Sequence, residues 1–80
     1  MKKGLITKIL HKGQKVYGVI AEFDETNVTV RFPICGVSGQ VEIGEQTLSI
    51  SDCRKPMLKQ DSELATFIRQ LTGVPLEKEG

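Results

Sequence analysis

The amino-acid sequence predicts a mainly β protein: a small five-stranded barrel, of OB-like or SH3-like type, with one C-terminal α-helix. Three observations lead to this fold class. Short runs of β-branched and aliphatic residues follow one another closely, glycine-containing turns separate them, and a helical spacing of apolar residues replaces them near the C-terminus. We expect the barrel within residues 1–55, the helix within 56–73 of the same domain, and a flexible tail over 74–80.

Two strands are expected around an N-terminal hairpin turn. Residues 4–10 and 15–23 are rich in the residue types that strands favour. The turn between them contains Gly13, which can adopt a positive φ without steric cost. Gly18, in the middle of the second run, indicates a bulge or a sharp bend of the kind that barrels need at their corners.

Three more strands are expected in the middle of the chain. Residues 28–32 alternate between apolar and polar types, which is the period of a half-buried strand. Pro33 follows, and it either ends the ladder or places it at a sheet edge. Short strands over 40–43 and 47–50 complete the set, with a glycine-containing turn over 44–46 between them.

The pattern becomes helical in the last third of the chain. Asp61 or Ser62 can cap a helix N-terminus, and Gly73 stands where a helix stop is expected. Between them, four apolar residues have the spacing of one helical face. We expect this stripe to pack on the barrel, since a chain of 80 residues has few large apolar side chains to spare: Leu64, Phe67, Ile68 and Leu71.

Composition limits the possible classes of protein. The chain is 39% hydrophobic and 26% charged, as in ordinary globular domains. It contains no apolar run long enough to span a membrane, and the apolar run after the basic start is too short for a signal peptide. We therefore expect a cytoplasmic protein that has no contact with membranes.

Enzyme and metal chemistry have little support in the sequence. No nucleophile elbow, metalloprotease motif, phosphate-binding loop or dinucleotide fingerprint is present. Cys35 and Cys53 do not form a C-x-x-C pair, and His11 is distant in sequence, so we expect two reduced cysteines and no metal site. The expectation is a binding module that is not an enzyme and has no cofactor.

The charge is unevenly spread although the net charge is only +1. Residues 1–20 hold five lysines and no acid, whereas 21–50 are acidic. An aromatic ring among lysines is the basic unit of single-strand nucleic-acid binding, because the ring stacks a base and the ammonium groups neutralise the backbone. The candidate nucleic-acid-binding residues are Lys8, Lys12, Lys15, Tyr17 and Arg31.

Several segments of the first half resemble the cold-shock domain. Lys3-Gly4 opens a strand, the second strand contains Tyr17-Gly18-Val19-Ile20, and residues 27–32 match the family's third strand. The resemblance implies an OB barrel that binds single-stranded RNA or DNA on strands two and three. Val19 and Thr29 stand where the cold-shock family has aromatic residues, and Arg31 stands where it has a histidine. Because stacking side chains are lost, we expect this chain to bind nucleic acid more weakly than that family does.

The same segments also resemble SH3-like and Tudor-like barrels, which occur in RNA chaperones and in protein–protein adaptors. A second hypothesis is therefore a protein-interaction module: an adaptor, a small regulator or inhibitor of a larger enzyme, or a homodimer. A basic hairpin and an acidic middle segment can pair between copies, and a strand that ends at Pro33 can accept a partner strand.

Overall fold

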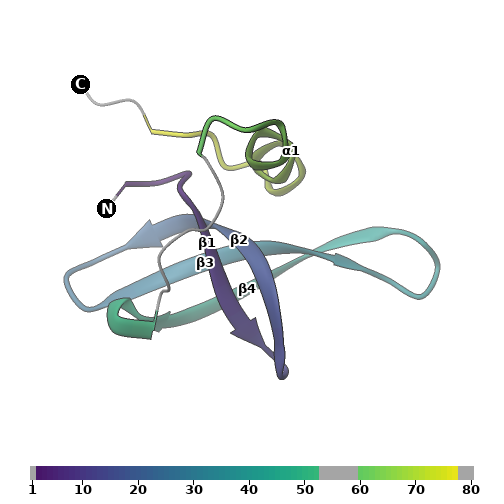
Figure 1. Cartoon of the computed structure of the whole chain (residues 1–80). Helices are drawn as coiled ribbons and strands as arrows, with labels where there is room; N and C mark the ends of the chain where they lie inside the picture. The colour runs from purple at the N-terminus through teal and green to yellow at the C-terminus, as the bar shows by residue number, and fades with distance from the viewer. Residues whose placement is uncertain (1, 53–59, 78–80) are drawn as a thin grey trace.

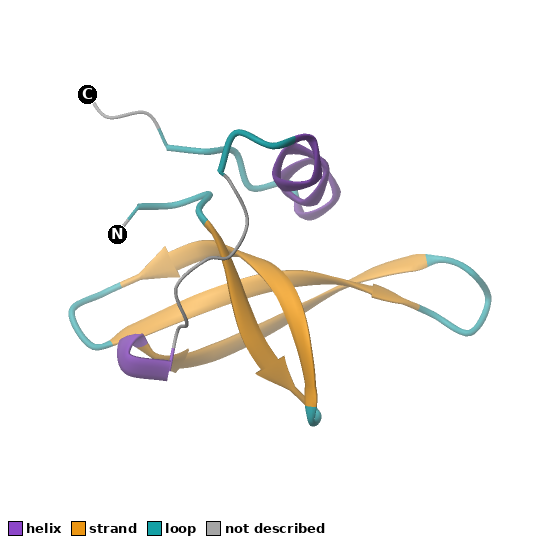
Figure 2. Ribbon diagram, viewed as in Figure 1, coloured by secondary structure: helices purple, strands orange, loops and turns teal. Residues whose placement is uncertain are grey.

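The computed structural model describes residues 2–52 and 60–77, which form one antiparallel sheet and one helix (Figure 1). The sheet is a meander in the order β1-β2-β3-β4. Its strands are β1 (Ile6–His11), β2 (Gln14–Phe23), β3 (Asn27–Cys35) and β4 (Val41–Ser49). A short 3₁₀ helix, η1 (Ile50–Asp52), follows β4, and α1 (Glu63–Thr72) lies over one face of the sheet (Figure 2).

The sheet has four strands and stays open, so the prediction of a closed five-stranded barrel was wrong. The two short strands expected over 40–43 and 47–50, and the turn over 44–46, are one continuous strand, β4. Gly44 pairs with Phe32 in the middle of this strand. A Cβ at Gly44 would lie 2.6 Å from Phe32 Cε2, so this glycine provides room for a ring and does not make a turn.

The open sheet is strongly curled, and β1 crosses β3 and β4 in the view of Figure 1. The His11 side chain reaches β4, where Nδ1 forms a hydrogen bond of 2.9 Å with Gln46 Oε1. The curl is helped by an irregularity in the β2–β3 register between Ile20 and Glu22. Gly18, the expected bulge, is regularly paired; a Cβ there would lie 2.4 Å from a methyl group of Val30.

The concave face of the sheet encloses what we call the inner cluster. Its members alternate along the strands, as the period of two predicts for β3. Phe32 is 1% exposed and is the largest fully buried side chain of the described residues. The cluster consists of Ile9, Ile20, Val28, Val30 and Phe32, with Leu5, Val16, Leu48 and Ile50 packed against it.

The opposite face of the sheet is covered by α1, which begins and ends as the sequence predicts. Ser62 is the N-cap, and its side chain accepts a hydrogen bond from the Ala65 amide at 3.2 Å. Gly73 ends the helix in the left-handed conformation, with φ 72°. Helix and sheet share a second core, the helix cluster, which consists of Ile6, Val19, Ala21, Ala65, Ile68 and Val74.

The face that α1 buries differs from the predicted stripe. Ala65, Ile68, Arg69 and Thr72 face the sheet, whereas Leu64 and Phe67 are 47% and 55% exposed. Ala65 is fully buried, and its small side chain lets the helix approach the sheet closely. The stripe prediction counted hydrophobicity alone and therefore favoured the larger side chains.

Arg69 and Gln60 connect the helical segment to the first strand. Arg69 Nε donates to the Gly4 carbonyl at 2.6 Å, and Arg69 Nη2 donates to Gln60 Oε1 at 3.0 Å. The same Gln60 amide accepts from the Ile6 N–H at 2.8 Å and donates to the Ile6 carbonyl at 3.1 Å. One glutamine side chain thus pairs with the outer edge of β1 as a neighbouring strand would.

The segments next to the two chain ends, residues 3–4 and 75–77, lie side by side (Figure 1). Val74 is buried, and the Glu77 N–H donates to the Lys3 carbonyl at 2.8 Å. Residues 74–77, which we expected to begin a flexible tail, are therefore held against the N-terminal segment. No helix within 2–52 and 60–77 has the length and apolar character needed to cross a bilayer.

The polar turn between β2 and β3 is organised by one carboxylate. Asp24 Oδ1 accepts hydrogen bonds from the backbone N–H groups of Thr26, at 2.8 Å, and Asn27, at 2.6 Å. The Asn27 N–H, which has the larger effect, and the Thr26 N–H lower the pKa of Asp24 because they stabilise the ionised carboxylate. The turn chemistry of Asp-x-Thr-Asn explains why the chain reverses here.

Candidate nucleic-acid interface

The β1–β2 hairpin sets the positions of the candidate lysines. Its two turn residues, Lys12 and Gly13, have φ of 50° and 79°, as a two-residue type I′ turn requires. The turn fixes the register, so that Lys8 lies opposite Tyr17 and Leu10 lies opposite Lys15. These four side chains consequently share one face of the hairpin, and Lys12 lies at its tip.

Lys8 and Tyr17 are in direct contact on this face. The Lys8 Nζ lies over the Tyr17 ring, 5.4 Å from its centroid, in a cation–π arrangement. Tyr17 is half-buried and packs against the helix cluster. One side of the ring therefore meets an ammonium group, and the ring is anchored to the core, so a base can stack on it only after Lys8 moves.

Arg31 lies apart from the hairpin lysines. It pairs with Val19 on β2 and with Glu45 on β4, and its Nε lies 3.2 Å from Glu45 Oε2. Arg31 also lines a cavity of roughly 320 Å³ near the C-terminal end of α1, together with Lys3 and Gly73. The structure therefore gathers Lys8, Lys15 and Tyr17, places Lys12 at the tip beside them, and gives Arg31 a carboxylate partner.

Leu10 belongs to the same hairpin face, although sequence reasoning did not select it. It is 58% exposed and lies opposite Lys15. The signal was present in the sequence, since Ile6, Lys8 and Leu10 alternate with the residues that face the inner cluster. Exposed apolar surface between two lysines can contact sugars and bases while the ammonium groups bind phosphates.

A cleft opens beside the hairpin because β2 and β3 separate. Their ladder ends at the pair Val19–Arg31, whereas β3 continues to pair with β4 as far as Cys35. The β3–β4 hairpin thus extends past the end of the ladder as an arm, which we define as residues 33–43 (Figure 1). The cleft has a volume of roughly 480 Å³ and is lined by His11, Lys12, Gln14, Val16, Phe32, Pro33, Ile34 and Cys35.

Pro33 occupies a position that its missing N–H allows. The Gly36 N–H donates to the Gln40 carbonyl, so even-numbered residues of β3 direct their backbone groups to β4. Odd-numbered residues direct theirs to the β2 side, where Pro33 and Cys35 lie beyond the end of the β2–β3 ladder. Pro33 does not end β3, because it pairs with Ile43 on β4, but it lies at an edge toward β2, because the β2–β3 ladder ends two residues earlier.

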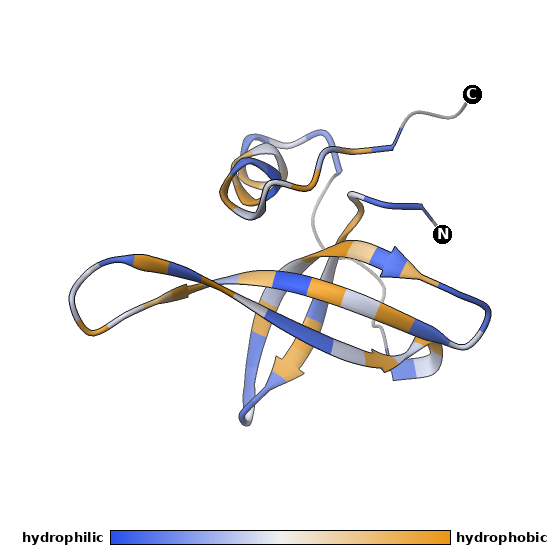
Figure 3. Ribbon diagram, turned by 180° about the vertical axis from the view of Figure 1, so that it is seen from behind, coloured by the Kyte–Doolittle hydropathy of each residue, from blue (hydrophilic) through white to orange (hydrophobic). Residues whose placement is uncertain are grey.

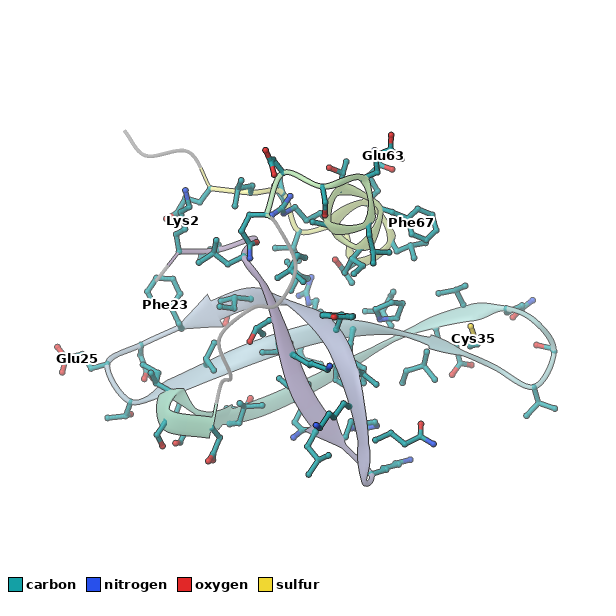
Figure 4. The ribbon with its side chains drawn as sticks, viewed as in Figure 1. Lys2, Phe23, Glu25, Cys35, Glu63 and Phe67 are labelled. Atoms are coloured by element: carbon teal, nitrogen blue, oxygen red, sulfur yellow. The ribbon has the colours of Figure 1, made fainter. Side chains whose placement is uncertain are left out.

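Side chains that could support metal or thiol chemistry are few among the described residues. Within 2–52 and 60–77, no group of three or more His, Cys, Asp or Glu side chains could hold a metal ion. Cys35 is a free and exposed thiol near the far end of β3 (Figure 4). Cys53, the other cysteine of the sequence, lies outside the described residues.

No protein-family model matches the chain, and neither the comparison with curated proteins nor that with solved structures gives a match. The geometry of the chain itself is therefore the only ground for assigning a function.

Proposed function

We propose that this protein is a small module that binds single-stranded RNA or DNA through the basic face of its β1–β2 hairpin. The observation that carries the proposal is the grouping of Lys8 and Lys15 with Tyr17 and Leu10 on one hairpin face, with Lys12 at the tip. No carboxylate occurs in residues 2–21, and the one acid of the hairpin, Glu22, lies at the end of β2 away from the turn.

The physical basis is charge neutralisation along a flexible backbone. Each lysine that contacts a phosphate releases condensed counterions, so affinity falls as salt rises. Three lysines on a single strand give a slope of roughly −2 in a plot of log K against log salt. The neutral side chains between the lysines contribute contacts that depend little on salt.

Fluorescence anisotropy with labelled single-stranded and duplex oligonucleotides, at low and physiological salt, tests this proposal. Lys15→Ala removes one positive charge from the hairpin face and is expected to weaken binding and to reduce the salt slope by roughly 0.7. Lys3→Ala is the matched control, since it removes an exposed lysine away from the hairpin and is expected to change binding much less. Binding that is equal for both variants, or absent at low salt, contradicts the proposed interface.

A second candidate function, protein–protein interaction, is favoured by the exposed apolar side chains of the arm. In Figure 3 the arm carries hydrophobic residues up to its tip. Large hydrophobic side chains that are exposed there are Ile34, Val37, Val41 and Ile43, and α1 adds Leu64 and Phe67. Exposed apolar side chains that lie together mark partner-binding regions in many small proteins, and Val41 and Ile43 share one face of the arm.

The homodimer version of this second candidate is tested by the mass in solution. Light scattering over a range of protein concentrations is expected to show a dimer that Val41→Lys and Ile43→Lys together dissociate. Both side chains are exposed and belong to the strand β4, so the folded monomer tolerates the change. A protein that is strictly monomeric at every concentration removes the homodimer.

A further inference from the structure

We propose that the cleft between β2 and the arm holds one unpaired nucleobase of the bound strand. This inference rests on the proposed function and deepens it, because it assigns the base a place distinct from the hairpin face that binds phosphates. The cleft volume of roughly 480 Å³ lies in the range of small-molecule sites, about 300–1,000 Å³.

The cleft offers backbone hydrogen-bonding groups that no neighbouring strand uses. The Ile20 N–H donates to the Leu5 carbonyl, so even-numbered residues of β2 face β1 and odd-numbered ones face the opening. Lys15 and Tyr17 therefore direct their N–H and C=O groups toward the β3 side of β2, where Gln14 and Val16 line the cleft. Cys35 presents the same pair from the other side. A nucleobase edge has both donors and acceptors and can satisfy such groups.

The walls of the cleft suit a flat and partly apolar ligand. Val16 and Ile34 extend the inner cluster to the cleft, and Phe32 lies beneath them. The His11 ring packs on Phe32, with centroids 4.6 Å apart, and is held by its hydrogen bond to Gln46. A base that enters meets an ordered imidazole and aliphatic walls instead of a flexible loop.

Charge around the cleft favours an anionic nucleic-acid strand beside it. Lys12 lines it, and no carboxylate is among the lining residues. The acidic side chain that the register places closest is Glu42, which lies opposite Ile34 on β4. A strand whose phosphates lie along the hairpin can therefore direct a base inward without meeting a negative charge at the entrance.

The same geometry disfavours an added peptide strand. Strand addition needs a continuous row of backbone donors and acceptors, and the free edge of β3 is interrupted by Pro33, which has no N–H. A base needs only one or two backbone groups. Tyr17 is a poorer base platform than the cleft, since Lys8 already lies over its ring.

Cys35 provides a reporter because the residue lines the cleft and its thiol is exposed to reagent. A Cys53→Ser variant leaves Cys35 as the single thiol, and its alkylation by a maleimide is followed with time. The probes are oligothymidylate and an abasic strand of the same length and charge. We expect saturating oligothymidylate to slow alkylation at least fivefold and the abasic strand to leave the rate unchanged.

A matched control moves the thiol out of the cleft. Val37 lies at the tip of the arm and is fully exposed, so Val37→Cys in a Cys35→Ser, Cys53→Ser background should be alkylated at the same rate with or without oligothymidylate. Conversely, prior alkylation of Cys35 is expected to weaken oligothymidylate binding roughly tenfold, the size of one lost base contact. Binding of the abasic strand is expected to be unaffected.

The outcomes separate the two proposals. Equal protection of Cys35 by both strands, or no protection although both bind, overturns the base cleft and leaves the hairpin interface in place. If neither strand binds at low salt, the proposed function itself fails, and the base cleft fails with it.

Discussion

Replacement of Gly44 by alanine is the sharpest test of how β4 is built. Gly44 lies mid-strand, opposite Phe32, and an added Cβ would be 2.6 and 2.9 Å from two ring atoms and 2.7 Å from Ile34 Cδ1. The Ile34 methyl is the end of a flexible and exposed side chain and can move. The Phe32 ring is 1% exposed and is enclosed by the inner cluster, so it has no free space into which to shift.

Two opposing contributions set the sign of the stability change in Gly44→Ala. Alanine in a strand interior is favoured over glycine by about 0.5–1 kcal/mol, because glycine loses more backbone entropy on folding. Overpacking a core costs about 1–3 kcal/mol. For Gly44→Ala we therefore expect a net destabilisation of about 1–2 kcal/mol, which lowers the melting temperature by about 5–15 °C in a domain of this size.

Urea and thermal unfolding followed by circular dichroism measure this change. The Phe32→Leu variant removes the ring atoms that an alanine at position 44 would meet. In that background, the cost of Gly44→Ala is expected to disappear, which gives a coupling energy within the range of about 0.5–3 kcal/mol found for contacting residues. A Gly44→Ala protein as stable as the parent, or more stable, would refute the packing of this ring on β4.

Three further substitutions test other parts of the fold. Gln60→Ala leaves polar groups at the edge of β1 without a partner and is expected to cost about 1–3 kcal/mol in urea unfolding, whereas Gln60→Glu keeps one acceptor and should cost less. Ser62→Ala removes the N-cap and is expected to cost about 1 kcal/mol, with Ser62→Asp as the variant that retains it. Hydrogen bonds from Asn27 and Thr26 lower the pKa of Asp24 in the folded protein, so its stabilising contribution is present above the unfolded pKa of about 3.9 and is lost as the pH falls through the folded value. Unfolding of Asp24→Asn is therefore expected to depend less on pH below about 4 than unfolding of the parent, and identical profiles would contradict this role.

Local features of the chain were readable from the sequence because they depend on neighbouring residues. The turn at Gly13, the cap at Ser62 and the stop at Gly73 each follow from the conformational preferences of one or two residues. The alternation over 28–32 places its apolar residues on one face, since side chains of any strand alternate. The grouping of Lys8 with Tyr17 also follows from the hairpin, once the turn has fixed the register.

Other features depend on contacts between residues distant in the sequence. A glycine between two short apolar runs predicts a turn, and only the ring of Phe32, twelve positions earlier, explains why Gly44 lies within a strand. The helix offers two overlapping faces that share Ile68. The face with Ala65 and Arg69 is the buried one, because Ala65 permits a close approach to the sheet and Arg69 donates a hydrogen bond to the Gly4 carbonyl.

The sequence by itself determined that the chain is mainly β, that it ends in a capped helix, and that its first hairpin is basic. These properties are sums over local preferences and charge. The tertiary structure alone decided that four strands form a curled open sheet, that Arg31 pairs with Glu45, and that β2 separates from β3 beside Pro33 to form a cleft. Such features arise where strands converge or separate in space, and the conformational preferences of neighbouring residues do not encode how far apart two strands lie.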